Sequence, residues 1–429
     1  MKSITIHPRE LIRAELSVPG DKSMSHRAAI LGALADGESH IRGFLTAKDC
    51  LCTLKALCKS GAEFRLDGND LTLRGVGLRG LRPAGEPLDL GNAGTGLSLL
   101  MGVASGQPFS TTLTGDDSLR RRPQRRIAEP LRKMGATIMG QGESCLPPIT
   151  IRGGALRGIE YSPTTPSAQV KSALLLGGLY AEGTTTVVER EQTRDHTERM
   201  LPAFGAKVEV DGLAVSVSQT EGLRAADFTV PGDISSAAFF LVAAAILPGS
   251  TVRISGVGVN PTRTGLFEVL SEMGARVETA KPASGGLAGG EPVADVVGHG
   301  ESLRGISIGG ALIPRLVDEV PILCVAASLA EGTTEIRDAP QLRQKESDRI
   351  ATIALELGKM GAQIEPLPDG LRIHGRAKLS GARCHSHGDH RIAMSLAIAA
   401  LAAEGTTEVE DVDCITTSFP EFMSILGAL

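Results

Sequence analysis

The chain has 429 residues, 42% of them hydrophobic and 22% charged, and a formal net charge of −5, which fits a large α/β protein of two domains. The acidic balance, the absence of tryptophan and the presence of only two tyrosines disfavour a nucleic-acid partner. The longest apolar run, residues 237–248, is too short to cross a bilayer, and no charged-then-apolar leader precedes Ile4. We therefore expect a cytoplasmic protein without a membrane partner, with its seven cysteines reduced and structural.

An internal duplication organises the sequence. Val-Pro-Gly-Asp at residues 18–21 returns at residues 230–233, and each copy precedes a mainly apolar stretch that closes in a small-residue turn. An apolar run of about fourteen residues, opened by Ser, Asp or Asn and ended by Gly, predicts a mostly buried helix. Weaker copies extend the pattern to six units, whose closing turns contain Gly37, Gly106, Gly183, Gly249, Gly332 and Gly405.

Each buried helix is predicted to lead into a strand, a second helix and another strand. Gly-Thr-Thr before a β-branched run, as in residues 183–187, predicts the first strand. A Gly-Ala pair followed by a predicted strand marks the end of the second helix. Such endings contain Gly61, Gly135, Gly205, Gly274 and Gly361.

The two ends of the chain predict how the units are shared between domains. The sixth unit closes at residues 427–428 with almost no chain left for a last strand, whereas residues 1–17 read as a strand with no helix before it. We expect the N-terminal segment to complete the C-terminal domain. The expected domains are residues 1–20 plus 231–429, and residues 21–230.

Basic residues gather where the units differ from one another. In the first unit Lys22 and Ser23 open the buried helix and Arg27 follows about one turn later, whereas the duplicate has neither cation. An ammonium, a hydroxyl and free backbone N–H groups at a helix N-terminus suit an anion. A capped helix with solvated charges is the alternative. The segment is not a phosphate-binding P-loop, because Asp21 separates Gly20 from Lys22.

The second and third units add further polar groups at helix starts. The Gly-rich residues 91–96 open the second buried helix, and residues 120–126 hold five arginines of which at least one is expected to face inward. Residues 167–169, Ser-Ala-Gln, open the third buried helix and suit sugar or cyclitol hydroxyls, and Arg194 follows the next strand. Tight packing, a solvated charge run and ordinary N-capping remain open as alternatives.

The fifth unit carries acidic residues at its predicted helix starts. Residues 318–319, Asp-Glu, stand at a helix start, and residues 343–349 open the next helix. Lys345 and Arg349 are four residues apart, so we expect them to share one helix face with Glu346 beside them. A carboxylate between two cations serves either as a proton donor or as an ion-pair partner.

The sixth unit contains a segment that resembles a metal site at first sight. Residues 384–391, Cys-His-Ser-His-Gly-Asp-His-Arg, lack a second compact ligand cluster and helical ligand spacing, which disfavours zinc. Arg391 stands in a position equivalent to that of Lys22. The helix starts thus supply seven cations, more than one phosphate needs: Lys22, Arg27, Arg122, Arg194, Lys345, Arg349 and Arg391.

These motifs together resemble the 5-enolpyruvylshikimate-3-phosphate synthase family over the whole chain. Residues 19–27 resemble its Pro-Gly-Asp-Lys-Ser-x-Ser-His-Arg motif, residues 91–95 its Gly-Asn-Ala-Gly-Thr loop, residues 343–349 its Arg-x-Lys-Glu-x-Asp-Arg signature, and residues 389–394 its last motif. The resemblance implies an α/β fold of two domains, an inverted α/β prism. Each domain would hold three βαβαββ repeats with buried helices, and the active site would lie in the interdomain cleft.

The resemblance also implies a reaction that needs neither metal nor cofactor. The enolpyruvyl group of phosphoenolpyruvate moves to the 5-hydroxyl of shikimate 3-phosphate through a tetrahedral ketal, and phosphate is released. The implied ligands of shikimate 3-phosphate are Lys22, Ser23, Arg27, Ser167, Ala168, Gln169, Arg194, Asp318 and Lys345. Those of phosphoenolpyruvate are Lys22, Gly94, Arg122, Gln169, Arg349 and Arg391.

The chemistry requires a base for the hydroxyl, an acid for the vinyl methylene and charge stabilisation for the leaving phosphate. We assign Asp318 as base, Glu346 as acid and Lys22 as the group that polarises the reacting oxygens. Glyphosate is implied as an inhibitor at the phosphoenolpyruvate position. Three residues depart from the family pattern: Ser98 replaces an Arg, Gln344 a Val, and Thr417 a Lys that binds phosphoenolpyruvate in many members.

Two other functions stay open at this point. The UDP-N-acetylglucosamine enolpyruvyl transferase family shares fold and donor, but it has Lys-Asn in place of Lys22-Ser23 and usually a reactive Cys in the loop at residues 116–122. A non-catalytic repeat scaffold that binds anions would leave Asp318 and Glu346 unexplained. We expect a monomer that acts on small molecules.

Overall fold

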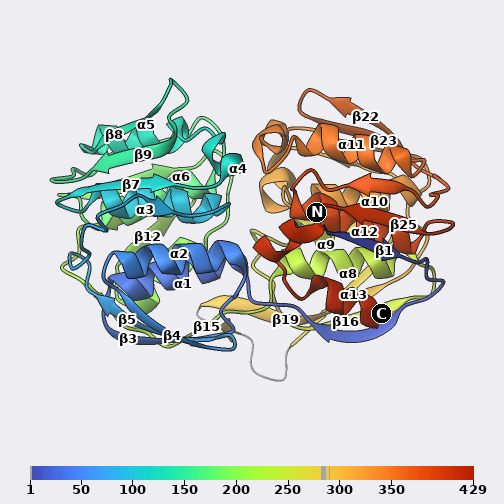
Figure 1. Cartoon of the computed structure of the whole chain (residues 1–429), viewed down its shortest axis with the longest axis horizontal. Helices are drawn as coiled ribbons and strands as arrows, with labels where there is room; N and C mark the ends of the chain where they lie inside the picture. Colours follow the sequence, from blue (N-terminus) through green and yellow to red (C-terminus); the bar gives the residue numbers. More distant parts are fainter. Residues whose placement is uncertain (1, 282–286, 289) are drawn as a thin grey trace. The chain divides into compact units, whose positions relative to one another are not determined.

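The computed structural model describes residues 2–281, 287–288 and 290–429, and the chain forms two compact units (Figure 1). From here on, unit 1 and unit 2 name these two parts of the chain, and the six units of the sequence are called repeats. Unit 1 contains Met1–Pro19, Pro231–Leu287 and Pro292–Leu429, and unit 2 contains Gly20–Val230 and Ala288–Glu291. The chain therefore passes between the units next to each Val-Pro-Gly-Asp motif and again on both sides of residues 288–291.

Three sheets of the described residues in unit 2 repeat one strand order, in which a short first strand runs parallel to the second and an antiparallel hairpin follows. Their orders are β14(Leu223–Arg224)-β3(Ala35–Arg42)-β5(Asp70–Val76)-β4(Glu63–Asp67), with β15(Phe228–Thr229) also on β3; β6(Leu88–Asp89)-β7(Ser110–Thr114)-β9(Leu146–Arg152)-β8(Thr137–Gln141); and β10(Glu160–Tyr161)-β11(Thr184–Val188)-β13(Ala214–Ser218)-β12(Val208–Asp211).

In the described part of unit 1, two sheets repeat the same strand order and the third keeps its first three strands. The sheets are β2(Arg13–Ser17)-β16(Thr251–Gly258)-β19(Glu291–His299)-β17(Arg276–Ala280), with β18(Leu287–Ala288) also on β19; β20(Ser307–Ile308)-β21(Thr333–Ile336)-β23(Gly370–His374)-β22(Gln363–Leu367); and β24(Arg383–His385)-β25(Thr407–Glu410)-β1(Ser3–Ile6).

The first seventeen residues form two strands rather than the single strand that the sequence predicts. β1 pairs antiparallel with β25, and β2 pairs parallel with β16, so both strands join sheets of unit 1. β15, which precedes unit 1's first buried helix along the chain, pairs instead with β3 of unit 2. In each unit, one sheet therefore contains a strand from the chain segment that leads into the first buried helix of the other unit.

Buried helices form the centre of each unit. In unit 2 they are α1(Lys22–Leu34), α3(Gly94–Ser105) and α6(Ala168–Gly178), and in unit 1 they are α8(Ile234–Ile246), α10(Val320–Leu329) and α12(His390–Leu401). Figure 1 shows α8, α10 and α12 packed on one another within unit 1. Every residue of α8 is buried, as its nearly uninterrupted apolar sequence requires.

Outer helices cover the buried ones, and the longer of them carry an apolar and a polar face. They are α2(Lys48–Lys59), α5(Arg125–Met134) and α7(His196–Met200) in unit 2, and α9(Gly265–Glu272), α11(Arg349–Lys359) and α13(Phe422–Ala428) in unit 1. Shorter turns are α4(Asp117–Arg120), η1(Leu201–Phe204), η2(Gly310–Arg315), η3(Pro340–Gln344) and η4(Val412–Thr417).

Three helix starts agree with the sequence, and Gly106 ends α3 as predicted, whereas the predicted helix end at Gly37 is wrong. Asp21, Asp233 and Asp389 each cap a buried helix through a backbone N–H, at 2.9, 2.8 and 2.9 Å. Gly37 does not end α1, because the helix stops at Leu34 and Gly37 lies within β3 with φ of +105°. The Gly-Ala glycines do end the outer helices, since Gly61, Gly135, Gly205, Gly274 and Gly361 all have positive φ.

No helix among the described residues is long and apolar enough to span a membrane. None of the seven cysteines is in a disulfide. Burial raises the pKa of Cys58 and of Cys384 to about 11, which keeps these thiols protonated at neutral pH.

Candidate active site

The start of α1 brings Lys22 against an acidic side chain. Lys22 is the first residue of the helix, and its Nζ lies 3.1 Å from Asp49 Oδ2. The Asp49 side chain is only 5% exposed and comes from the first turn of α2. No motif marks Asp49 in the sequence. The signal for it is its position 27 residues after Lys22, a spacing that recurs in unit 1.

Arg27 is anchored from several directions. Its Nε donates to Thr197 Oγ1 at 2.7 Å, its Nη2 to Ser172 Oγ at 2.7 Å and its Nη1 to the Ser23 carbonyl at 2.9 Å. Burial lowers the pKa of Arg27 to about 10, and the positive charge of Arg194 adds to that lowering. Arg27 stays charged at neutral pH, and the two predicted phosphate ligands lie in one electrostatic environment.

The loop that carries Arg194 is fixed from inside unit 2 by a buried lysine. Lys171 is 1% exposed, and its Nζ lies 2.6 Å from Glu189 Oε2 and 2.6 Å from Glu198 Oε1. Thr193 Oγ1 donates to Glu189, and the Lys171 Nζ lies 3.5 Å from the Thr193 carbonyl oxygen. Lys171 thus ties both ends of the Arg194 loop to α6. No motif in the sequence marks Lys171 as a functional residue.

Arg122 is the arginine of the basic run that contacts the Gly-rich loop. Its Nη2 donates to Asn92 Oδ1 at 2.5 Å and to Ser118 Oγ at 3.1 Å. A Cβ added to Gly94 would lie 3.1 Å from Arg122 Nη1. The structure therefore brings the predicted phosphoenolpyruvate ligands Gly94 and Arg122 into contact, with the guanidinium lying next to the first residue of α3.

The start of α6 is connected to both of these elements. Ser167 caps the helix, and Ala168 is its first residue. Gln169 Oε1 accepts a hydrogen bond from Arg126 Nη2 at 2.7 Å, and Gln169 Nε2 lies 3.4 Å from Thr95 Oγ1. A second arginine of the basic run, at an exposed position, therefore binds Gln169, a contact that the sequence does not reveal.

In unit 1 the predicted base lies between two cations. Lys345 Nζ is 3.1 Å from Asp318 Oδ1, and Arg349 Nη1 is 3.4 Å from the same oxygen. The Asp318 side chain is 13% exposed, whereas that of Arg349 is 2% exposed. Asp318 is thus the more accessible partner of a largely buried cation.

The expected helical face shared by Lys345 and Arg349 is wrong. α11 begins at Arg349, and Lys345 lies before it in an extended conformation after η3. Asp348 caps α11, which leaves residues 345–348 as a loop. Lys345 and Arg349 still converge on Asp318, but they do so because the loop turns back rather than because they are four residues apart on a helix.

Arg349 is held by three carboxylates. Its Nε donates to Asp389 Oδ2 at 2.8 Å and its Nη2 to Glu346 Oε2 at 2.7 Å, in addition to the contact with Asp318. Burial alone would lower the pKa of Arg349, but the charges of Asp389 and Glu346 raise it above its ordinary value. Arg349 links the α12 start, the α11 start and the predicted base into one network.

Arg391 is in a different environment from Arg349. It lies in the first turn of α12, is 8% exposed, and its Nη1 is 3.7 Å from Glu319 Oε1. Among the described residues this is the one ion pair of its side chain. Arg391 therefore keeps more of its donors available for an anion than Arg349 does.

One spacing produces the acid–base pairs of both units, with the charges exchanged. In the first repeat the buried helix supplies Lys22, and Asp49 of the outer helix contacts it from 27 residues downstream. In the fifth repeat Asp318 stands at the buried helix, and Lys345 contacts it from 27 residues downstream. The same spacing thus joins a cation and a carboxylate in both repeats, with their order along the chain reversed.

Two of the departures from the family pattern bond locally. Ser98 Oγ donates to the Gly94 carbonyl at 2.8 Å, one turn back in its own helix. Thr417 Oγ1 lies 3.4 Å from His390 Nδ1, again at a spacing of 27 residues. At the sixth repeat, the position that corresponds to Lys345 therefore carries a hydroxyl instead of a cation.

The Cys-His segment serves a local ion-pair cluster. His387 Nε2 lies 2.8 Å from Glu356 Oε1, Lys359 Nζ is 2.8 Å from the same oxygen, and the His385 N–H donates to Glu356 Oε2 at 2.8 Å. Within the described ranges, no three His, Cys, Asp or Glu side chains are grouped as metal ligands.

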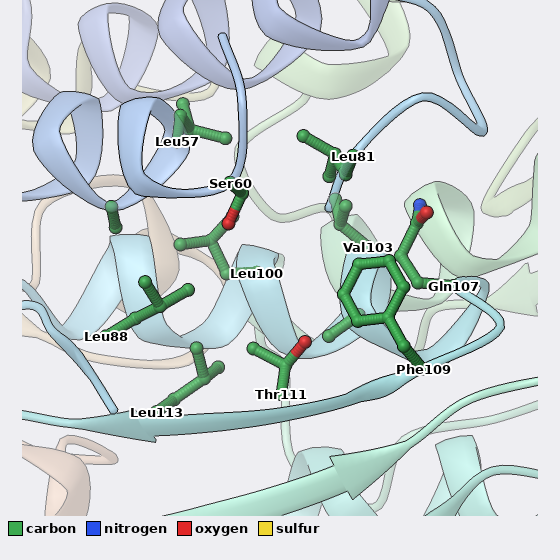
Figure 2. A pocket seen from close by; sticks show the side chains of 12 residues that line it. Leu57, Ser60, Leu81, Leu88, Leu100, Val103, Gln107, Phe109, Thr111 and Leu113 are labelled. Atoms are coloured by element: carbon green, nitrogen blue, oxygen red, sulfur yellow. The ribbon is translucent and has the colours of Figure 1, made fainter. Parts of the chain in front are cut away.

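An apolar pocket in unit 2 lies apart from these residues. Figure 2 shows Leu57, Leu100 and Phe109 among its lining side chains, and the polar groups come from Ser60, Gln107 and Thr111. The twelve lining residues include neither a charged side chain nor any predicted site residue. Because the predicted substrates are anions, this pocket does not suit them.

Comparison with solved structures places the chain among proteins with the enolpyruvyl transferase fold. An EPSP synthase from Acinetobacter baumannii matches with a TM-score of 0.87 at 44% identity, over 100% of this chain and 98% of that one. An enolpyruvyl transferase from Streptomyces tendae matches with a TM-score of 0.79 at 19% identity, over 99% and 96% of the two chains, which shows the fold. The predicted two-domain inverted α/β fold is confirmed.

The family follows from the sequence comparisons. The model of the EPSP synthase (3-phosphoshikimate 1-carboxyvinyltransferase) family matches residues 6–426. A 3-phosphoshikimate 1-carboxyvinyltransferase of Desulforamulus reducens is 51% identical over 99% of this chain and 98% of its own length. The chain belongs to the EPSP synthase family, which confirms the resemblance seen in its motifs and the predicted class of enzyme.

Proposed function

We propose that this protein transfers the enolpyruvyl group of phosphoenolpyruvate to the 5-hydroxyl of shikimate 3-phosphate and releases phosphate. The proposal is carried by two pairs of a cation and a carboxylate at the same spacing of 27 residues, Lys22 with Asp49 and Lys345 with Asp318. Each pair combines a cation with a carboxylate near a helix start, and Lys22 and Lys345 lie in the segments 19–27 and 343–349 that resemble motifs of the EPSP synthase family.

The substrates require many cations because together they bring two phosphates and two carboxylates. In unit 2, Arg27 and Arg194 would hold the shikimate phosphate with the Ser167 hydroxyl, and Arg122 with Gly94 would hold phosphoenolpyruvate. In unit 1, Lys345 would hold shikimate 3-phosphate, and Arg349 and Arg391 would hold phosphoenolpyruvate. The full proposed sets are Lys22, Ser23, Arg27, Ser167, Ala168, Gln169, Arg194, Asp318 and Lys345 for the first substrate, and Lys22, Gly94, Arg122, Gln169, Arg349 and Arg391 for the second.

The proton transfers follow from the chemistry of the two substrates. Asp318 accepts the proton of the 5-hydroxyl while the hydroxyl oxygen of shikimate 3-phosphate forms a bond to C2 of phosphoenolpyruvate. Glu346 gives a proton to the C3 methylene. The resulting ketal collapses when the methyl group loses a proton and the bond from C2 to the phosphate oxygen breaks. Lys22 polarises the reacting oxygens, and the surrounding cations neutralise the departing phosphate.

Arg349 suits this sequence because it contacts both proposed proton-transfer groups. Its Nη1 is 3.4 Å from Asp318, and its Nη2 is 2.7 Å from Glu346. A shared guanidinium fixes the two carboxylates relative to one another, which lowers the cost of orienting them in the transition state. We propose that the enzyme acts in the cytoplasm as a monomer of 44.7 kDa, with no metal or cofactor.

The test is phosphate release from phosphoenolpyruvate with shikimate 3-phosphate as acceptor, compared with UDP-N-acetylglucosamine. We expect release with the first acceptor alone. Asp318→Ala should slow turnover about 10²–10⁴-fold, the range for loss of an acid–base group. The exposed Asp227 gives the control variant Asp227→Ala, which should retain full turnover. Release with the amino-sugar nucleotide, or normal turnover of Asp318→Ala, would contradict the proposal.

A further inference from the structure

A buried carboxylate forms an ion pair with Arg391. Glu319 follows Asp318, stands at the residue before α10 and is 1% exposed. Its Oε1 accepts a hydrogen bond from Ser235 Oγ and is the oxygen that faces Arg391 Nη1 at 3.7 Å. A fully buried carboxylate needs partners, and Glu319 has two on the same oxygen.

The Ser235 hydroxyl is itself held from the next layer. Arg263 Nη2 donates to Ser235 Oγ at 2.7 Å and lies 3.4 Å from Asp233 Oδ1. Ser235 and Arg263 are 2% and 3% exposed. Asp233 caps α8, and Arg263 precedes α9 by two residues, so Glu319 connects Arg391 to the starts of two further helices.

The geometry around Arg391 is that of a cation held in place without being saturated. At 3.7 Å the contact with Glu319 is an ion pair rather than a hydrogen bond. Arg349, by contrast, donates to Asp389, Glu346 and Asp318. An incoming anion can therefore bind the N–H groups of Arg391 without first displacing a hydrogen-bonded carboxylate.

The second oxygen of Glu319 is unusual for a buried group. In the part of the chain that the structure describes, Oε2 is buried and accepts no hydrogen bond. Buried acceptors in native proteins normally have a partner, so an open one calls for a role. A carboxylate with one oxygen anchored by Ser235 and the other open can pair with both terminal nitrogens of a guanidinium when Arg391 shifts.

We propose that Glu319 is a positioning residue for phosphoenolpyruvate binding, which it supports by holding Arg391 ready for the anion. This inference rests on the proposed function, since it takes the reaction and the role of Arg391 from there. Ser235 and Arg263 fix the carboxylate, Glu319 fixes the guanidinium by charge, and the open Oε2 takes up a second N–H as the guanidinium reorients on the substrate.

The decisive variant is Glu319→Gln, which keeps the size of the side chain and removes its charge. Because Arg391 loses its one ion-pair partner among the described residues, we expect the KM for phosphoenolpyruvate to rise about tenfold, as for loss of an orienting partner behind a ligand-binding group. The KM for shikimate 3-phosphate and the melting temperature should change little. A purely structural role would move both KM values together or lower the melting temperature.

A second pair of variants keeps the test decisive if Glu319→Gln does not fold. Ser235→Ala removes the hydroxyl that anchors Glu319 and should raise the phosphoenolpyruvate KM in the same direction by a smaller factor. Ser236→Ala, one residue along the same buried helix, is the matched control and should match the unmodified enzyme. An unchanged phosphoenolpyruvate KM in Glu319→Gln, or equal effects of Ser235→Ala and Ser236→Ala, would overturn the proposal. Absence of phosphate release from the unmodified enzyme would instead overturn the proposed function.

Discussion

His26 and Arg27 are neighbours on α1, and both are basic residues in a buried, positively charged environment. Burial, together with the charges of Lys22 and Arg27, lowers the pKa of His26 to about 3, so this imidazole is neutral at physiological pH. Its Nδ1 lies 2.9 Å from Thr53 Oγ1, a bond that a neutral ring can make. His26 therefore supports α1 against α2 and adds no cation to the site.

This neutral histidine predicts a specific pH dependence of stability. Its pKa is about 3 in the folded protein and 6.5 ordinarily, so only the unfolded chain binds the proton between these values. Stability is then fully present above pH 6.5 and falls by about 1.4 kcal/mol per pH unit below it, down to pH 3. Between pH 6.5 and pH 4.5 the loss is two units times about 1.4, or roughly 2.8 kcal/mol.

The measurement is urea unfolding of the unmodified protein and of His26→Asn at pH 7 and pH 4.5. The variant cannot gain this proton on unfolding, so its free energy of unfolding should fall less on acidification. His40→Asn, at an exposed position, should behave like the unmodified protein. The same acid sensitivity in His26→Asn as in the unmodified protein would show that His26 does not remain neutral.

Gly94 provides a second prediction at the residue scale, concerning the implied inhibitor glyphosate. A Cβ at this position would lie 3.1 Å from Arg122 Nη1 and 3.9 Å from Leu119 Cδ1, so Gly94→Ala forces the guanidinium to shift by a few tenths of an ångström. Glyphosate is longer than phosphoenolpyruvate and tolerates that shift less well. A difference of about 2 kcal/mol would raise its inhibition constant about thirtyfold more than the phosphoenolpyruvate KM.

The inhibition constant is measured against varied phosphoenolpyruvate for the unmodified protein and Gly94→Ala. Gly154→Ala is the control, because a Cβ there meets nothing within 4 Å. Non-competitive inhibition, or equal constants in both proteins, would rule out Gly94 as part of this pocket.

Not every functional side chain could be read from the sequence. Lys22, Arg122 and Arg391 stand out because they are basic residues at places where the repeats differ from one another. Asp49 and Glu319 do not, because their partners lie 27 and 72 residues away and only the packing of the helices brings them together. Repeat spacing would have predicted Asp49, but nothing in the sequence predicts that the open oxygen of Glu319 lies behind Arg391.

At the scale of elements, close helix packing depends on small residues. α3 and α6 pack together in unit 2, and a Cβ added to Gly102 would lie 2.2 Å from the Ala173 carbonyl oxygen. Gly102→Ala must therefore push the two buried helices apart. We expect a loss of about 1–3 kcal/mol in the free energy of unfolding, the usual cost of overpacking a core.

Gly358 is a matched helical control in unit 1. It lies within α11, and a Cβ there meets nothing within 4 Å. Gly358→Ala should stabilise the protein by about 0.5–1 kcal/mol, because alanine loses less backbone entropy in a helix. Urea or thermal unfolding compares the two variants. A Gly102→Ala protein as stable as Gly358→Ala would mean that α3 and α6 adjust without cost.

The elements show which local signals are reliable. Caps such as Asp21 and Asp389 predict helix starts correctly because a side-chain oxygen satisfies backbone donors within three residues. Gly37 misleads because a glycine with positive φ can lie inside a twisted strand as well as at a helix end. Lys345 misleads because Asp348, three residues later, caps α11 and leaves Lys345 in the preceding loop.

At the scale of the whole molecule, the two units are linked by exchanged strands. β2 lies in a sheet of unit 1 although it leads into α1 of unit 2, and β15 lies in a sheet of unit 2 although it leads into α8 of unit 1. The chain passes between the units beside each of these strands, and again around residues 288–291. Such links keep the units in one chain while leaving each with its own hydrophobic core.

The proposed function predicts that substrate draws the units together, because the groups assigned to shikimate 3-phosphate come from both: Arg27 and Arg194 from unit 2, Lys345 and Asp318 from unit 1. We expect saturating shikimate 3-phosphate to reduce the radius of gyration measured by small-angle scattering. A compact chain of 429 residues has a radius of gyration of about 22 Å, so the ligand-free value should exceed this figure and the bound value approach it. UDP-N-acetylglucosamine at the same concentration is the control and should leave the radius unchanged. An unchanged radius at saturating shikimate 3-phosphate, from a ligand-free value well above 22 Å, would mean that one unit binds this substrate without the other.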